Sequence, residues 1–402
     1  MARNRRRLGE GPEAVSQALI EKAREVGRKV ERLKRVAHEA LTREAVSRTQ
    51  LTGALHVSLV ARAQLAARLR REAFEVFLIK ARPRRLRRNN RLSQTLDRAL
   101  ARLGAFGQAV VIARSGVWRG TGRPLHDLRH MAAYARRRAR ADVAPQALFD
   151  QAWYLAAYPD VAAAGVAPLV HYLTAGHRES RSPHPLFDDA HYRAQFAQDL
   201  AATSLTPLEH YLRVGAARGA SPHPLFDVAH YIAQSPALAP GEDVLSHYLR
   251  VGAGLGISPH PLFDPGWYLE RAKGASSGPP LVHFLTRGWR EGISPHPLVS
   301  PLWYVERHPE VAAQGFDPLT HFVVAGAAAG FSPGPWFDLP HYVAARGDAL
   351  QGNPLIDYLQ GGAWEVSEPK PGFPTAAYMA GHPELVRAGL TPLEHWARLG
   401  IR

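Results

Sequence analysis

Cysteine is absent from the 402 residues of this chain, and so are long apolar runs. The first absence excludes disulfide bonds, thiolate metal sites and cysteine nucleophiles. The second predicts no transmembrane helix, which needs about 18 or more apolar residues in succession. The longest uncharged candidate, residues 318–337, is interrupted by His321, Pro333 and Pro335. The basic start of the chain is not followed by the apolar core of a signal peptide, so we expect neither a membrane span nor a secretion signal.

Acidic and basic residues are unevenly divided along the chain. Residues 1–145 contain 34 Lys and Arg against 12 Asp and Glu, a net charge of +22, whereas residues 146–402 contain 16 against 23, a net charge of −7. A change of this size predicts a domain boundary near Pro145 and different partners for the two parts.

Residues 12–80 are predicted to be helical, because apolar side chains recur mostly at steps of three and four residues. The pattern indicates a long amphipathic helix or a helical hairpin with its turn near Thr52 and Gly53. Self-association as a coiled coil stays open, although the apolar heptads are irregular. We assign residues 1–90 to a basic amphipathic helical arm and residues 91–145 to a basic helical connector.

The densest basic stretch of the arm is interrupted by Pro83, which breaks the helix. Three interpretations stay open: docking on an anionic membrane surface, binding of nucleic acid, or a solvated helix end. The basic residues are Lys80, Arg82, Arg84, Arg85, Arg87 and Arg88. In the connector, His126 and His130 share one face of a predicted helix, but two ligands do not make a metal site, and we interpret them as a polar face.

A seven-residue segment, Ser182–Asp188 (Ser-Pro-His-Pro-Leu-Phe-Asp), recurs in full at Ser221 and Ser258. A weaker copy begins at Ser294 and a divergent one, Ser-Pro-Gly-Pro-Trp-Phe-Asp, at Ser332, so the spacings from Ser182 onward are 39, 37, 36 and 38 residues. A period of this length predicts an array of stacked helical units rather than one globular core. We therefore expect an all-α protein in which residues 146–402 form an α-solenoid or superhelix of about seven units.

The first unit, residues 148–181, shows the expected plan. Asp150 is placed to cap a first helix, Pro168 to open a second main helix, and Gly176 to end it as a C-cap. The corresponding glycines of later units are predicted to be Gly215, Gly252, Gly288, Gly326, Gly361 and Gly400. The sixth unit departs from the plan, with Asp357 in place of a histidine.

The unit resembles a known family pattern. Phe149–Val161 (Phe-Asp-x-x-Trp-Tyr-Leu-x-x-Tyr-Pro-Asp-Val), followed by Gly165, Pro168–Leu169 and His171–Leu173, is similar to repeats of bacterial surface-polysaccharide proteins, where they often flank glycosyltransferase domains. The resemblance covers about residues 148–402 and implies a role in building or modifying cell-surface glycans. For the whole chain we expect a cytoplasmic location, with peripheral attachment to the inner membrane as an open alternative. No transferase domain is recognisable.

We accordingly expect a non-catalytic scaffold. Its units would bind a partner protein, such as a glycosyltransferase or an export component, or a polysaccharide, and its arm would dock on a membrane surface or an acidic partner. The alternatives are a glycosyltransferase or its accessory subunit, and a nucleic-acid-binding protein acting through residues 1–145.

No catalytic residue, cofactor or metal site is predicted. We interpret Asp150, Asp188, Asp227, Asp264 and Asp338 as helix caps. Two histidine sets recur by unit: a first histidine set, His171, His210, His247, His283, His321 and His395, and a second histidine set, His184, His223, His260 and His296. We expect both to hydrogen-bond backbone groups. The surface proposed for a ligand or partner consists of Trp289 and Trp364, which follow stop glycines, with the second histidine set.

Overall fold

The computed structural model describes residues 21–22, 24–44, 47, 58, 61–62, 65, 68–69, 72, 98–118, 120–140, 146–235, 238, 242–274, 278–313, 315–366 and 368–400. Throughout these residues the regular elements are helices and there is no strand, so the all-α prediction is confirmed for this part of the chain. No helix within the described ranges is long and apolar enough to cross a membrane.

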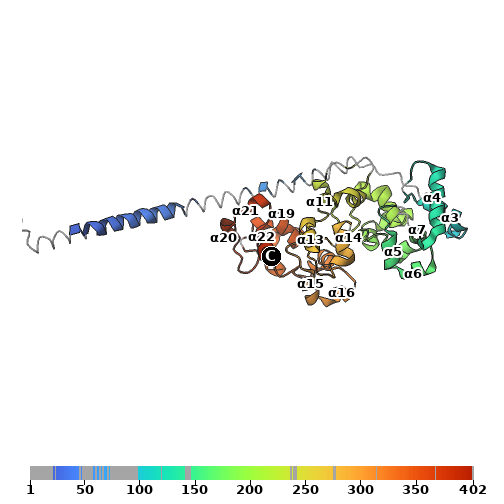
Figure 1. The fold of residues 1–402 in the computed structure, drawn as a ribbon. Helices are drawn as coiled ribbons and strands as arrows, with labels where there is room; N and C mark the ends of the chain where they lie inside the picture. The colour runs from blue at the N-terminus through green and yellow to red at the C-terminus, as the bar shows by residue number, and fades with distance from the viewer. Residues whose placement is uncertain are drawn as a thin grey trace, which may run out of the picture.

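The arm is described mainly between residues 24 and 44, which are helical and exposed (Figure 1, blue). Lys29 pairs with Glu25 at 2.8 Å, and Lys34 pairs with Glu31 at 3.0 Å. In both pairs the opposite charges are about one helical turn apart, which is the spacing expected of ion pairs on a helix surface. The predicted turn at Thr52–Gly53 and the basic stretch from Lys80 to Arg88 lie outside the described residues.

The connector forms α3 (Gly104–Ser115) and α4 (Pro124–Arg137), followed by the 3₁₀-helix η1 (Arg138–Arg140). The two helices pack together, and α3 also contacts the first unit. The Tyr134 hydroxyl of α4 accepts the Leu169 N–H of unit one at 3.1 Å. Contacts therefore cross the domain boundary predicted near Pro145.

Each of the seven units predicted from the sequence has a first helix. These are α5 (Gln151–Ala157), α8 (Asp189–Gln195), α11 (Val228–Gln234), α13 (Pro265–Ala272), α15 (Pro301–Arg307), α18 (Leu339–Arg346) and α20 (Thr375–Gly381). Shorter middle helices follow in some units: α6 (Pro159–Ala164), α9 (Ala197–Thr203), α16 (Pro309–Ala313), η8 (Gly347–Ala349) and α21 (Glu384–Ala388).

Each unit also has a last helix that begins one residue before a buried leucine. These are α7 (Pro168–Thr174), α10 (Pro207–His210), α12 (Val244–His247), α14 (Pro280–His283), α17 (Pro318–His321), α19 (Pro354–Gln360) and α22 (Pro392–Gly400). Four of them continue as π-helices, η3 (Tyr211–Gly215), η5 (Tyr248–Gly252), η6 (Phe284–Gly288) and η7 (Phe322–Gly326). Three 3₁₀ segments follow last helices of the units: η2 (Gly176–Glu179), η4 (Ala216–Arg218) and η9 (Gly362–Trp364).

The recurrent aspartates cap the first helices. The Trp153 N–H donates to the Asp150 carboxylate at 3.0 Å. The same contact recurs at Asp188, Asp227, Asp264 and Asp338, with distances of 2.9–3.0 Å. In unit five, Ser300 occupies this place without a side-chain cap bond. Burial of the preceding aromatic residue, such as Phe149, anchors the start of the helix to the core.

The Ser-Pro-His-Pro segment makes a tight turn, the junction turn, that joins neighbouring units. In the first copy, the Phe187 N–H donates to the His184 carbonyl at 2.9 Å. The Pro183 carbonyl accepts the Asp150 N–H of the preceding unit at 3.0 Å. Equivalent bonds run from Asp188 to Pro222, Asp227 to Pro259, Asp264 to Pro295 and Ser300 to Pro333, at 2.9–3.0 Å. The same backbone contact thus links each of these junctions to the helix start before it.

A tyrosine of each first helix, buried in units one to six and half-buried in unit seven, reaches the last helix of its own unit. In unit three, the Tyr231 hydroxyl shares a 2.7 Å hydrogen bond with His247 Nδ1. A Cβ added to Gly252 would lie 1.8 Å from that hydroxyl oxygen, so only glycine fits there. Equivalent glycines are Gly176, Gly215, Gly288, Gly326 and Gly362.

The prediction that these glycines are C-caps is wrong at Gly176, Gly215, Gly252, Gly288 and Gly326, whereas Gly361 is the C-cap of α19. Gly176 and Gly215 do not have positive φ, and Gly215 continues into η4 with helical angles. The close approach of a tyrosine hydroxyl, not a left-handed turn, requires the glycine. In unit six the residue in this position is Gly362, next to Tyr342, and not the predicted Gly361.

A second buried tyrosine supports the helix start of the following unit. The Tyr172 hydroxyl accepts the Leu208 N–H at 3.3 Å, and the Tyr358 hydroxyl accepts the Leu393 N–H at 3.0 Å. Where phenylalanine replaces this tyrosine, at Phe284 and Phe322, the next last helix has its own side-chain cap: Asp317 for α17 and Asn353 for α19. These helix starts are therefore supported by a tyrosine hydroxyl, by a side-chain cap or, at α10 with Thr206, by both.

The last unit also contacts the fourth. Arg398 of α22 donates to Asp264 at 2.5 Å, and Glu394 faces His296 Nε2 at 3.2 Å. In Figure 1 the units follow one another in chain order, with α22 returning beside α13. These contacts join parts of the chain that are about three units apart in sequence.

Candidate functional site

The first histidine set lies inside the units. Each Nδ1 is hydrogen-bonded to a tyrosine hydroxyl of the same unit, and not to a backbone group as expected. The pairs are Tyr154–His171, Tyr192–His210, Tyr231–His247, Tyr268–His283, Tyr304–His321 and Tyr378–His395, at 2.5–3.0 Å. Asp357 takes this place in unit six and accepts from Tyr342 at 2.6 Å.

The second histidine set is buried in the junction turns. His184 Nδ1 accepts the Leu186 N–H at 3.0 Å, and the other three make the same contact with the leucine two residues later at 3.1–3.2 Å. Burial lowers the pKa of His184 and His223 to about 4 and that of His260 to about 3. The prediction that His184, His223, His260 and His296 form a ligand surface is therefore wrong, because the turn folds each imidazole inward.

Trp289 and Trp364 were expected on the surface and are also buried, each with 7% of its surface exposed. The chain does not leave the core after the stop glycine: Trp289 N–H donates back to the Phe284 carbonyl at 3.2 Å, which turns the indole onto the core. Arg290 covers the outer side of the ring, 4.2 Å from its centroid. Neither tryptophan offers a face for sugar stacking.

His126 and His130 of α4 are exposed, and their Nε2 atoms lie 3.1 Å apart. Asp127 beside them is engaged elsewhere, because its carboxylate accepts the Thr121 N–H and hydroxyl at 2.8–3.0 Å. These contacts, the backbone N–H first, lower the pKa of Asp127. His126 and His130 thus provide two imidazoles on one helix face, without a third ligand from Asp127.

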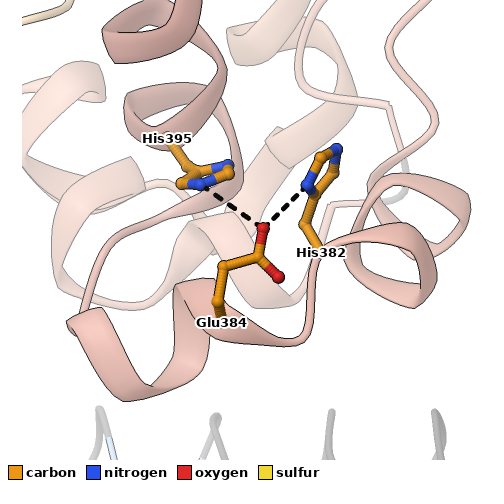
Figure 2. A group of neighbouring side chains, drawn as sticks. All are labelled: His382, Glu384 and His395. Carbon is orange, nitrogen blue, oxygen red and sulfur yellow. Dashed lines mark hydrogen bonds and ion pairs between the residues drawn. The ribbon is translucent and has the colours of Figure 1, made fainter.

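A cluster in unit seven brings three metal-ligating side chains together, and it is the one such group among the described residues. His382 follows α20, Glu384 begins α21, and His395 lies in α22 (Figure 2). His382 Nδ1 is 2.9 Å from Glu384 Oε1, and His395 Nε2 is 3.8 Å from the same oxygen. All three donor atoms lie within 4.8 Å of one another. We refer to these residues as the His-Glu-His cluster.

Neighbouring groups hold the His-Glu-His cluster in this arrangement. Tyr378 bonds His395 Nδ1 at 2.9 Å, and its ring packs against His382 with centroids 4.5 Å apart. The backbone N–H at the start of α21, followed by His382, lowers the pKa of Glu384. Burial lowers the pKa of His395. A carboxylate and a neutral imidazole therefore face each other at neutral pH.

Other units place a carboxylate near the same position but neutralise it with arginine. In unit one, Arg181 donates two 2.8 Å bonds to Asp160. In unit two, Arg218 donates to Asp199, which lies 3.6 Å from His210 Nε2. The partners of Glu384 within the described ranges are instead two imidazoles.

Unit five has the same residues at the same spacing: His308, Glu310 and His321 match His382, Glu384 and His395. There the ring of Phe331 stacks on His308, with centroids 3.7 Å apart and planes at 8°, and lies 6.2 Å from His321. Phe331 therefore packs against both imidazoles, and His308 Nδ1 lies 3.7 Å from Glu310 Oε1. The His-Pro-Glu motif followed by histidine eleven residues later is the sequence signal that could have identified the cluster in unit seven.

Comparison of this chain with protein-family models, with curated proteins and with solved structures finds no match.

Proposed function

We propose that this protein is a non-catalytic scaffold, an α-solenoid of about seven units, that binds a component of cell-surface polysaccharide synthesis, modification or export. The partner is a glycosyltransferase, an export protein or the glycan itself. The resemblance of the units to repeats of bacterial surface-polysaccharide proteins supports this assignment. Arrays of this kind build long surfaces, which bind extended or multiple partners.

The use of the recurrent residues supports a binding role. The aspartates cap helices, the first histidine set bonds tyrosines, and the second histidine set is buried in the junction turns. These recurrent residues therefore stabilise the units. The outward-facing residues vary between units, and we propose that they recognise the partner.

The observation that carries the proposal is the position of the exposed apolar side chains. In the described part of residues 146–402, all but Leu399 of the large exposed apolar residues lie between 255 and 324: Leu255, Leu269, Leu302, Phe316 and Val324. Exposed apolar side chains that gather into one patch are typical of interaction surfaces, and we propose that these five residues contribute to such a patch. We therefore assign partner binding to units three to five.

The arm has a separate part in the proposal. Its net positive charge suits an anionic membrane surface or an acidic partner, each cation near such a surface contributing about 1 kcal/mol. We place the protein in the cytoplasm, peripheral to the inner membrane. Deleting residues 1–90 is expected to abolish flotation with vesicles containing anionic lipid, while the helical circular dichroism of residues 146–402 persists.

The binding role is tested by affinity capture of the tagged full chain from its host, followed by mass spectrometry and glycan analysis. We expect glycosyltransferases, export proteins or polysaccharide in the bound fraction. Leu302→Glu with Phe316→Glu should remove them, whereas the control Leu399→Glu, an exposed apolar residue outside units three to five, should not. Equal recovery by both variants, or recovery of none of these classes, would contradict the proposal.

A further inference from the structure

The His-Glu-His cluster has the composition of a transition-metal site. Two imidazole nitrogens and one carboxylate oxygen suit zinc and similar divalent ions. In a tetrahedral zinc site with bonds of about 2.0–2.1 Å, ligand atoms lie about 3.3 Å apart. The separations of 2.9 and 3.8 Å at Glu384 Oε1 bracket this value.

The supporting contacts also match those of a metal site. Because His395 Nδ1 is hydrogen-bonded to Tyr378, Nε2 is the nitrogen left to coordinate, and it faces Glu384. Metal-ligating histidines usually have such a partner on the second nitrogen, which fixes the orientation of the ring. His382 and Glu384 are accessible, with 35% and 58% of their side chains exposed, so an ion can reach them from solvent.

A cation suits the charge of this cluster. In units one and two the equivalent carboxylates, Asp160 and Asp199, each pair with an arginine. In unit seven Glu384 lies beside two imidazoles that a metal ion can use as ligands. A divalent ion would neutralise Glu384 and hold α20, α21 and α22 together.

We propose that His382 Nδ1, Glu384 and His395 Nε2 bind one Zn²⁺ ion, with a fourth coordination position open to water or to a group of a binding partner. Three protein ligands with an open position distinguish such a site from the closed four-ligand sites of purely structural zinc. The ion links three helices of the last unit and presents an exchangeable position at its surface.

The test is isothermal titration of the metal-free full chain with Zn²⁺ at pH 7.5. The exposed pair His126 and His130 is replaced by glutamine in every variant, because it offers a competing two-histidine face. The remaining chain should bind one ion. His382→Ala and Glu384→Gln should each weaken binding at least about tenfold, since even loss of an outer-shell contact costs about 10–100-fold.

Unit five provides the matched control. His308→Ala and Glu310→Gln remove the equivalent residues of unit five, where Phe331 packs against both histidines, and should leave zinc affinity unchanged. His395 is not used as the test position, because its loss would also break the contact with Tyr378. Circular dichroism establishes that each variant is folded.

Cobalt provides an independent measurement. Co²⁺ in the full chain should give the visible absorption of a four-coordinate ion, and this absorption should disappear in His382→Ala and persist in His308→Ala. Equal zinc affinity of His382→Ala and the parent chain, or no stoichiometric binding by the parent, would overturn the proposal.

Discussion

Replacement of Gly252 by alanine tests how each unit is closed. The added Cβ would lie 1.8 Å from the Tyr231 hydroxyl oxygen and 2.8 Å from Cζ of the same ring. Tyr231 is fully buried and bonded to His247, so the ring cannot move without losing that contact. The substitution therefore acts on packing and on a buried hydrogen bond together.

The expected loss of stability follows from these two effects. Overpacking a core costs about 1–3 kcal/mol, and leaving a buried polar group unsatisfied costs about 1–3 kcal/mol. Alanine regains up to about 1 kcal/mol, because Gly252 lies in the helical segment η5. We expect a net loss of about 1–5 kcal/mol in the local unfolding free energy, which is about 5- to 5000-fold in exchange protection.

Amide hydrogen exchange followed by mass spectrometry measures this loss in unit three, because repeat arrays can open unit by unit. Gly254→Ala is the matched control: Gly254 is exposed, and its added Cβ would meet nothing closer than a carbonyl oxygen at 3.4 Å. Adding Tyr231→Phe to Gly252→Ala should recover part of the loss, since the hydroxyl is the closest clash. Equal protection in Gly252→Ala and Gly254→Ala would refute the reasoning.

Three further predictions concern caps and buried histidines. Asp188→Ala should cost about 1 kcal/mol in thermal or urea unfolding, whereas Ser300→Ala, where no cap bond exists, should cost much less; equal effects would contradict the capping role. Because burial lowers the pKa of His260 to about 3, this histidine contributes stability that is present above pH 6.5 and lost as the pH falls toward 3. Between pH 3 and 6.5, His260→Asn should reduce the slope of the unfolding free energy against pH by at most about 1.4 kcal/mol per pH unit. An unchanged slope would contradict this role of His260. Tyr358→Phe should lower exchange protection at the start of α22 about tenfold by removing the acceptor of the Leu393 N–H; unchanged protection there would count against it.

Local signals in the sequence predicted local structure well. A cap such as Asp150 needs only a carboxylate before a helix. Its donor, the Trp153 N–H, is three residues away in the sequence. The Asp150 N–H, however, donates to the Pro183 carbonyl, and no pattern within one unit reveals that contact.

The glycine prediction failed at most positions, Gly361 being the exception, because two requirements have the same sequence signal. A glycine after a helical pattern suits a C-cap, but it also suits close approach by another group, and Gly252 serves the second. The error extended to Trp289 and Trp364, since a helix assumed to end at the glycine would release the following indole to solvent. In the structure the helical path continues and buries both rings.

The His-Glu-His cluster was missed for a different reason. His395 was interpreted from the sequence as a recurrent structural residue. That interpretation did not consider that its second ring nitrogen, Nε2, is available to bind an ion. His382 and Glu384 come from another part of unit seven, so only the packing of α20, α21 and α22 brings the three together. Comparing unit seven with unit five would have shown the shared spacing but not which of the two sets brings its ligand atoms close enough to hold an ion.

The central claim is that the recurrent residues build units joined one to the next, which leaves the outer surface for binding. Amide exchange of the full chain tests it most directly at Asp188, Asp227 and Asp264, whose N–H groups donate across the junctions at 2.9 Å. The account predicts that these amides exchange far more slowly than those of the exposed helix at residues 24–44. Exchange as rapid as in that helix would show that the units are not joined through the junction turns.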